Sequence, residues 1–387
     1  MARKAAAPLP ACRVEVVSDA RALLDMGPLW DGLVRRAGLD HPFQSHAWVR
    51  SWWESFGAGR RLHVLLVRAG EEAVALAPLM LGPARLYGLP LRRLGSLYNE
   101  HTPRFDLVVA DRRDDACRAI WSHLRASSDD WDLLELCQVP QGSQATAELA
   151  RLAEADRFLV ASWRASESPY VPLRDGWDRY LMTLSHNHRA KLRKRLRRLE
   201  RRGRVALETI DSEEGLDRAL EDGWRLEAGA WKDRAGTAVR LSSSLGRFYA
   251  SLARHAARAG ILRLFFLTVG GARIAFAYAL RHGDKVYVLK SGYDAAYAGY
   301  SPYNLLTGLI LEEACRRGLS EYDFLGGNDE WKMHWTDKVR SHEWLYVFPG
   351  RLKARVLHGV KFGVVPRLAR LPLYRTVRDT LAGSGGR

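Results

Sequence analysis

A loop of small residues followed by a helix start is the first feature of this sequence that could do chemistry. The stretch 291–318 reads SGYDAAYAGYSPYNLLTGLILEEACRRG, and an apolar run ends at Tyr293, just before the small residues. Ser301 and Pro302 suit the N-cap and the first position of a helix. The unpaired N–H groups of a helix start attract phosphate, and the sequence has no acidic residue between 295 and 311 to repel it. We therefore predict a pyrophosphate-binding loop, with an ordinary capped turn as the alternative. The residues that would form this loop are Ala298, Gly299, Tyr300, Ser301, Pro302, Tyr303 and Asn304.

Two residues could take a proton from an incoming nucleophile. Glu227 lies in the stretch RLEAGAWKDRAG, and His101 lies in NEHTPRFD. A carboxylate or an imidazole can serve as a general base near neutral pH. The alternatives are a solvated helix carboxylate for Glu227 and a hydrogen-bonded loop residue for His101. Lys332 could neutralise a developing oxyanion or a phosphate, or could be a surface cation.

The elements that must position these residues fall into two series with the same order. Each half is predicted to contain a strand, two helices, three antiparallel strands, a helix and a further strand. In the first half we expect helices at 19–37, 45–56 and 114–126, and strands at 13–17, 62–67, 73–81, 105–109 and 131–136. In the second half we expect helices at 177–202, 213–228, 245–259 and from 301, and strands at 205–210, 261–269, 272–281, 285–293, 320–326 and 343–348. The predicted domains are residues 12–160, residues 161–349 and a basic amphipathic tail, 350–387.

The matching helix of the first half offers an internal comparison. Its start reads VVADRRDDACRAI and carries Asp111, Asp114 and Asp115. Carboxylates at a helix start stabilise the helix and repel phosphate. Only the second half is therefore expected to bind a phosphate-bearing ligand.

Composition limits the classes of partner and compartment. The 387 residues include 60 Lys and Arg against 44 Asp and Glu, a formal charge of +16. Nucleic acid, an anionic membrane face and polyanionic small molecules are candidate partners, and a generally arginine-rich composition is the alternative. The four cysteines are scattered without a CxxC pair, so neither a metal site nor a disulfide framework is expected. Without a signal peptide or a run of about 20 apolar residues, a cytoplasmic location is predicted. The tail could dock on the second domain or lie on an anionic membrane face.

One stretch concentrates the basic residues. Between His188 and Arg204 the sequence has ten Lys or Arg residues, and Leu192, Leu196 and Leu199 form the apolar seam of a helix. Such a helix could be a nucleic-acid contact. It could equally border an acceptor groove or solvate the outer face, and we favour this interpretation because no aromatic residues interleave with the basic ones. Nucleic acid is therefore not the expected partner.

Several segments together resemble a known family. FQSHAWVRSWW, LSHNHRAKLRKRLRRLERRG, WKDRAG, GYDAAYAGYSPYNLL and YDFLGGNDEWKMHW occur in this order between about Val14 and Phe348. They resemble the CelD/BcsL acetyltransferases of the GNAT superfamily, which are named for cellulose biosynthesis. That branch is related to the Fem aminoacyl transferases, which carry two GNAT-like domains in one chain. The resemblance implies an α/β (α+β) fold of two tandem GNAT-like domains, each a mixed, mostly antiparallel sheet flanked by helices.

The resemblance also implies an activity and a set of residues. The second domain would bind acetyl-CoA or another acyl-CoA, without a metal, and transfer the acyl group to an amine or hydroxyl acceptor. That acceptor could be a saccharide or an envelope-polysaccharide precursor. Asp323, in an Asp-Phe-Leu stretch, would border the active site or anchor a turn. Residues that would contact the acceptor are Asn99, Arg104, Trp231, Lys232 and Trp331.

Position 331 departs from the family pattern. The family usually has Tyr-Lys where this sequence has Trp331-Lys332. An indole cannot donate a proton as a phenol does, so any acid role of that tyrosine is in doubt here. Two alternatives remain open: a Fem-like aminoacyl transferase that uses charged tRNA, and a binding module without catalytic activity.

Overall fold

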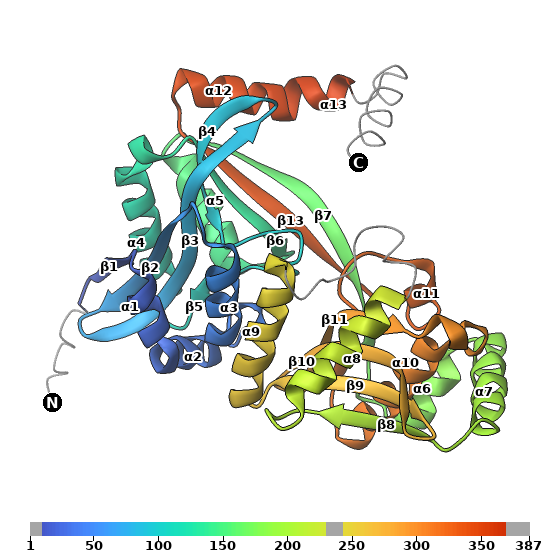
Figure 1. Cartoon of the computed structure of the whole chain (residues 1–387). Coiled ribbons are helices and arrows are strands. Elements are labelled where there is room, and N and C mark those ends of the chain that lie inside the picture. The colour runs from blue at the N-terminus through green and yellow to red at the C-terminus, as the bar shows by residue number, and fades with distance from the viewer. Residues whose placement is uncertain (1–9, 230–242, 369–387) are drawn as a thin grey trace, which may run out of the picture.

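The computed structural model describes residues 10–229 and 243–368. Over these ranges the chain forms one long sheet flanked by helices (Figure 1). The strand order is β1-β2-β3-β4-β6-β13-β7-β12-β11-β10-β9-β8, with β5 paired to β3. Strands pair antiparallel except at β4–β6 and β11–β12. The predicted fold class, a mixed and mostly antiparallel sheet flanked by helices, is confirmed.

The elements of the N-terminal half have the following bounds: β1 (Cys12–Val17), α1 (Ala20–Asp25), α2 (Gly27–Arg36), η1 (Pro42–Gln44), α3 (His46–Phe56), β2 (Arg61–Ala69), β3 (Glu72–Leu86), β4 (Leu89–Ser96), β5 (Val108–Val109), α4 (Arg113–Ala126), η2 (Ser128–Asp130), β6 (Leu133–Pro140) and α5 (Gln144–Ala155). Strand β7 (Leu159–Pro172) leads into the C-terminal half. That half contains α6 (Trp177–Thr183), α7 (His186–Glu200), β8 (Val205–Ile210), α8 (Leu216–Gly229), α9 (Ser244–Arg258), β9 (Leu262–Val269), β10 (Ala272–His282), β11 (Lys285–Tyr293), η3 (Ala295–Tyr300), α10 (Pro302–Arg316), β12 (Glu321–Asp323) and α11 (Glu330–Met333). The chain continues with β13 (Val339–Phe348), α12 (Leu352–His358), η4 (Gly359–Val364) and α13 (Val365–Leu368).

The two halves repeat one arrangement of strands. In the first half, β1, β2, β3 and β4 pair as successive antiparallel neighbours, and β4 then pairs with β6 in parallel. In the second half, β8, β9, β10 and β11 do the same, and β11 pairs with β12 in parallel. A repeat is therefore present in the strand pairing, but the last antiparallel strand of this series in the first half is β4 and not the expected strand at 105–109, of which only Val108–Val109 (β5) is a strand.

Strands β7 and β13 join the two halves. The first part of β7 pairs with β13, and its last residues, Tyr170–Pro172, pair with β12 of the second half. Strand β13 is the last strand of the chain, but in the sheet it lies between β7 and β6 of the first half. Because β7 starts just before residue 161, the sheet runs without interruption across the expected boundary. The division into domains at residue 160 stays a prediction.

An apolar cluster that contains residues of both halves holds the halves together. One cluster contains Trp48 of α3 and Phe248 of α9, whose rings meet edge to face with centroids 5.2 Å apart. A second cluster lies under α4 and α5 and includes Trp121, and a third surrounds α10 and includes Leu306. The positions of residues from the two halves are therefore fixed relative to each other.

Two predicted helices are divided in the structure. The helix expected over 19–37 is interrupted at Met26, where Gly27 and Pro28 begin α2. The helix expected over 177–202 is interrupted at Leu184, because the Ser185 side chain accepts a hydrogen bond from the His188 N–H and starts α7. Over 10–229 and 243–368, no helix combines the length and apolar character needed to cross a bilayer. In the same ranges, His, Cys, Asp and Glu side chains form no group of three or more suited to a metal ion.

Candidate active site

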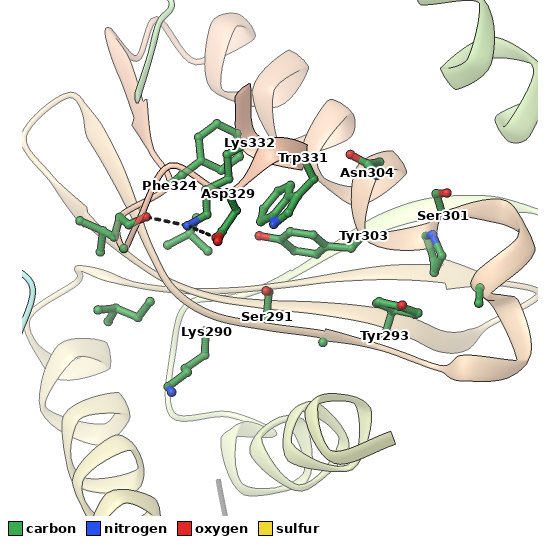
Figure 2. Close-up of a pocket in the computed structure, with 17 residues that line it drawn as sticks. Lys290, Ser291, Tyr293, Ser301, Tyr303, Asn304, Phe324, Asp329, Trp331 and Lys332 are labelled. Carbon is green, nitrogen blue, oxygen red and sulfur yellow. Dashed lines mark hydrogen bonds and ion pairs between the residues drawn. The ribbon is translucent and has the colours of Figure 1, made fainter. Parts of the chain in front are cut away.

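A gap between two strands creates the candidate site that contains most of the predicted donor-loop residues. Strands β11 and β12 pair only over Lys285–Tyr287 and Glu321–Asp323, and then separate. Strand β11 continues as far as Tyr293 along β10, with a β-bulge at Leu289. Beyond Tyr287, β12 no longer pairs with β11, so a ligand can approach the edge of β11 that faces β12. A cavity of about 450 Å³ lies in this gap (Figure 2). Its lining residues are Val288–Tyr293, Ala298, Ser301–Asn304, Phe324–Gly326, Asp329, Trp331 and Lys332.

The predicted phosphate loop forms one end of this cavity. The small residues fold into η3, in which the Asp294 side chain accepts a hydrogen bond from the Ala296 N–H. Ser301 has a left-handed backbone, with φ 48°, and its side chain does not cap α10. Ser301 and Pro302 thus take the predicted N-cap and first helical positions, but the Ser301 side chain accepts no hydrogen bond from a first-turn N–H group. Those N–H groups lie at the cavity without a side-chain cap, and this arrangement suits an anion. Gly299 and Tyr300 belong to η3 but do not line the cavity.

The basic helix α7 packs beside the same loop. The Arg202 Nε atom donates a hydrogen bond to the Tyr300 hydroxyl over 3.2 Å. The Arg198 guanidinium carbon lies 5.1 Å from the centre of the Tyr300 ring. Two of the ten basic residues are thus held next to the predicted phosphate loop.

An aromatic wall borders the middle of the cavity. The ring of Trp331 meets the ring of Tyr303 edge to face at 5.2 Å, and the ring of Phe324 at 5.6 Å. Figure 2 shows the Tyr303 hydroxyl directed into the gap between Trp331 and Ser291. Burial raises the pKa of Tyr303, so its phenol stays protonated at neutral pH. The site therefore contains a phenol, although position 331 does not supply it.

Lys332 is engaged by the loop that follows β12. Its Nζ atom donates hydrogen bonds to the carbonyls of Leu325, over 3.0 Å, and Gly327, over 2.9 Å, and pairs with Asp329 at 2.8 Å. A lysine ammonium has three N–H donors, and each one has a partner here. At Gly326 a side chain would place Cβ 3.2 Å from the Lys332 Nζ atom. This geometry favours a role in shaping the cavity wall over a role at an oxyanion.

The two predicted bases lie near one lysine on the other side of β11. Glu227 of α8 is fully buried, and its Oε1 atom is 4.0 Å from the Lys290 Nζ atom. Side chains alternate along a strand, so Lys290 points away from Ser291, as Figure 2 shows. Burial lowers the pKa of His101, the charge of Lys290 lowers it further, and the Glu227 carboxylate raises it. His101 of the first half and Glu227 of the second half are therefore in the same electrostatic neighbourhood.

A close backbone contact fixes Glu227 against β11. At Gly292 a side chain would place Cβ 2.4 Å from the Glu227 Cα atom, so only glycine permits this approach of α8. Sequence reasoning did not include Gly292 or Lys290. The alternation in KVYVLKSGY could have indicated that Lys290 and Gly292 share a face opposite to Ser291.

Asp323 and Arg104 form a buried ion pair between the halves. Both side chains are fully buried, and Arg104 Nη2 donates to Asp323 Oδ2. Asp323 also accepts hydrogen bonds from Arg340, over 2.7 Å, and from the Leu325 N–H, over 2.9 Å. The Arg104 Nε atom is 2.9 Å from His342 Nε2, and burial together with the Arg104 charge lowers the pKa of His342 to about 4. This network ties β12 to the first half and lies outside the cavity lining.

The remaining predicted residues take other positions. The Asn99 side chain accepts a hydrogen bond from the His101 N–H over 3.1 Å, so it shapes the loop and does not line the cavity. Trp231 and Lys232 lie outside the described residues. Of the predicted site residues, Ala298, Ser301–Asn304, Trp331 and Lys332 line one cavity. Glu227 and His101 lie on the opposite side of β11, near Lys290.

Comparisons with known proteins bear on the fold and on the segment that contains the cavity. Residues 186–333 match the family model described as an acetyltransferase (GNAT) domain. This segment includes β11, η3, α10 and the loop after β12, which together form the cavity. No curated protein matches the chain in sequence.

Solved structures share the fold over most of the chain. The crystal structure of FemX has a TM-score of 0.60 at 14% identity and covers 86% of this chain and 98% of that chain. The C-terminal domain of a putative lysylphosphatidylglycerol synthetase from Agrobacterium fabrum has a TM-score of 0.54 at 14% identity, covering 89% and 96%. A conserved protein of unknown function from Bacteroides thetaiotaomicron has a TM-score of 0.52 at 14% identity, covering 87% and 100%. The chain therefore shares the fold of these structures over most of its length, and within it residues 186–333 match an acetyltransferase (GNAT) domain.

Proposed function

We propose that this protein transfers an acetyl or other acyl group from coenzyme A to an amine or hydroxyl acceptor. The single observation that carries the proposal is the gap between β11 and β12, whose cavity leads to the uncapped start of α10. A GNAT acetyltransferase match over the same residues supports it. The CelD/BcsL resemblance supports a saccharide or an envelope-polysaccharide precursor as the acceptor.

In this proposal, the C-terminal half holds the donor. The first-turn N–H groups of α10 would bind the pyrophosphate, and Arg198 and Arg202 would add positive charge beside the loop. The pantetheine arm would occupy the gap between the strands, against the aromatic wall of Tyr303, Phe324 and Trp331. A cavity lined by both apolar and polar side chains suits such an arm, because the arm alternates amide and alkyl groups.

The chemistry would need a base, an acid and a site for the developing negative charge. Glu227 or His101 would remove the acceptor's proton, since an amine with a pKa of about 10.4 is mostly protonated at neutral pH. The open backbone edge of β11 would stabilise the oxyanion. Tyr303 would protonate the departing thiolate, because burial keeps its phenol protonated. Tyr303 would thus take the role that Trp331 cannot fill.

A thiol-release assay with acetyl-CoA and a panel of amines and sugars tests this function. We expect acceptor-dependent release of free coenzyme A. Mass spectrometry of a ligand retained during native purification would independently identify the donor. Absence of both a retained coenzyme A species and any thiol release across the panel would favour a binding protein without catalytic activity.

A tRNA-dependent aminoacyl transfer is the second candidate. The observation in its favour is that Arg198 of α7 and Arg202 just beyond it lie next to Tyr300 of η3, in a chain that shares its fold with FemX. A gel-shift titration with tRNA and duplex DNA at about 150 mM salt distinguishes the two functions. We expect no binding in the micromolar range. Micromolar binding of tRNA that is lost when Arg193, Lys194, Arg197 and Arg198 are neutralised would make the tRNA-dependent reaction the leading function.

A further inference from the structure

Exposed apolar side chains gather at the end of the molecule opposite the C-terminal half of the sheet. Over the described ranges, ten large apolar side chains are exposed, and six of them lie on α12, on η4, on β7 beside η4 or at the tip of the β3–β4 hairpin. These six are Tyr87, Leu89, Trp163, Leu352, Val356 and Val364. Single exposed apolar residues are ordinary on a protein surface, but a gathered set marks an interaction surface.

The segment Leu352–Leu368 has two apolar sides. Its inner side docks on the sheet, where Ala354 and Leu357 are buried against Leu91 of β4 and Leu133 of β6. Its outer side carries Leu352 and Val356, which are one helical turn apart and are 79% and 51% exposed. The π-helical turn η4 then keeps Val364 on the outside, 47% exposed, while Phe362 packs inward. Docking on the sheet thus leaves a second apolar stripe uncovered by any described residue.

The β3–β4 hairpin extends this outer surface. Tyr87 and Gly88 form its two-residue turn with φ values of 51° and 81°, and Leu89 follows, 48% exposed. Ala84 and Leu86 of the hairpin pack in the same cluster as Phe362 of η4. Figure 1 shows the hairpin lying alongside α12.

The charge of this segment selects the class of partner. Residues 351–368 include Arg351, Lys353, Arg355, Lys361 and Arg367 and contain no Asp or Glu. Acidic groups from the neighbouring loop engage two of these cations: Asp129 pairs with Arg351, and Asp132 pairs with Lys353. Arg355 has no acidic partner among the described residues, so net positive charge borders the apolar stripe.

We propose that the outer side of Leu352–Leu368, together with the hairpin tip, binds the surface of an anionic membrane. Aliphatic side chains flanked by Lys and Arg, with Trp163 and Tyr87 nearby, match the requirements of a lipid headgroup boundary. A second copy of the chain fits less well, because a twofold contact would bring the same cations together. The sequence beyond the segment, RLPLYRTVRDTL, keeps the mixture of apolar and basic residues.

Co-sedimentation of the full chain with lipid vesicles tests this surface. We expect binding to vesicles that combine phosphatidylglycerol with phosphatidylcholine, no binding to phosphatidylcholine alone, and weaker binding at high salt. The double variant Leu352→Asp, Val356→Asp should bind at least about tenfold more weakly. Met182→Asp is the matched control, because Met182 is 69% exposed but lies on α6, and it should bind like the wild type.

A second variant keeps the test decisive if the double variant fails to fold. Arg355→Glu leaves the apolar stripe intact and should also weaken binding to the anionic vesicles. Wild-type chain that fails to sediment with either vesicle overturns the proposal, as does undiminished binding in both variants. A dimer seen by light scattering that the double variant separates would show that a second copy occupies this surface instead.

Discussion

The two halves of the molecule build the same junction from different residues. In each half, two parallel strands are joined by three residue pairs, β4 with β6 and β11 with β12. The residue before the intervening helix is left-handed in both, Arg112 with φ 49° and Ser301 with φ 48°, and neither side chain caps its helix. Counting from these residues, Asp115 of α4 and Asn304 of α10 occupy the same third helical position.

The junctions differ in the space between the strands and in the charge at the helix start. In the first half, Gly95 lies so close to β6 that a Cβ atom would be 2.6 Å from the Glu135 carbonyl oxygen, and the Cys137 N–H donates to Ser96 Oγ over 3.2 Å. Asp115 there pairs with Arg112 at 2.7 Å. In the second half the strands separate and the helix start has no acidic residue. We therefore expect an anion site in this fold to need both an open pair of strands and a helix start without carboxylates.

The largest effect is expected from the base on the far side of β11. Glu227→Gln keeps the shape of the buried side chain and removes the base, so turnover should fall about a hundredfold or more while acyl-CoA binding persists. The rate of thiol release, measured as a function of pH, gives the size of this loss. A variant with wild-type turnover and pH profile would remove Glu227 from the mechanism.

His101 is the companion variant for that experiment. Burial and Lys290 lower the pKa of His101, so its imidazole is neutral at pH 7. If His101 is the base, the rate should fall only when the pH drops below about 6.5, the ordinary pKa of histidine. His101→Asn should slow such a rate and abolish this limb of the profile. If neither Glu227→Gln nor His101→Asn changes the turnover or its pH profile, the substrate or a water molecule removes the acceptor's proton.

The next largest effect is expected from Tyr303, whose phenol lies at the gap between β11 and β12. Tyr303→Phe should lower kcat about tenfold to a hundredfold with little change in acyl-CoA affinity, because it removes the proton donor and keeps the aromatic wall. Trp331→Tyr in this background should restore part of the rate, since the family pattern has a phenol there. Equal kcat for wild type and Tyr303→Phe would contradict the assignment of Tyr303 as the acid.

A smaller effect is expected from the helix beside the loop. Arg198→Ala with Arg202→Ala should weaken acetyl-CoA binding about threefold to tenfold, and the loss should shrink at high salt, because exposed charges are screened. Arg193→Ala with Arg197→Ala is the control on the same helix. Isothermal titration should show the control pair binding like the wild type, and an equal loss in both pairs would indicate a general effect of charge.

Much of this comparison could be predicted from the sequence. The small-residue loop, the absence of acidic residues from 295 to 311 and the aspartates of α4 are local patterns, and the structure places them at the two helix starts. That only the start of α10 binds phosphate stays a prediction. The strands with clear apolar runs, such as β9 and β10, were also predicted within a residue or two.

The pairing of strands that are far apart in the sequence could not be predicted from local patterns. Strand β4 was missed because its sequence LPLRRLGS lacks alternation, and β7 was missed because many of its side chains are exposed. The pairing of β13 with β6 joins residues about 200 positions apart, and no periodicity reports such a contact. The partners of Lys332 depend on the backbone of the loop after β12, so its sequence position could not distinguish a wall residue from an oxyanion ligand.

Isothermal titration of acetyl-CoA into the wild type and two exchanged variants tests the central claim most directly. Asn304→Asp gives α10 the residue of α4, and it should abolish or greatly weaken the single site through repulsion of the pyrophosphate. The introduced carboxylate can still accept the hydrogen bond that Trp335 Nε1 donates to Asn304 Oδ1 over 3.2 Å, so the fold should persist. Asp115→Asn gives α4 the residue of α10, and it should create no second site, because β4 and β6 stay closed. The account predicts one site per chain in the wild type and in Asp115→Asn. Undiminished binding by Asn304→Asp, or a wild type that does not bind acetyl-CoA, would contradict it.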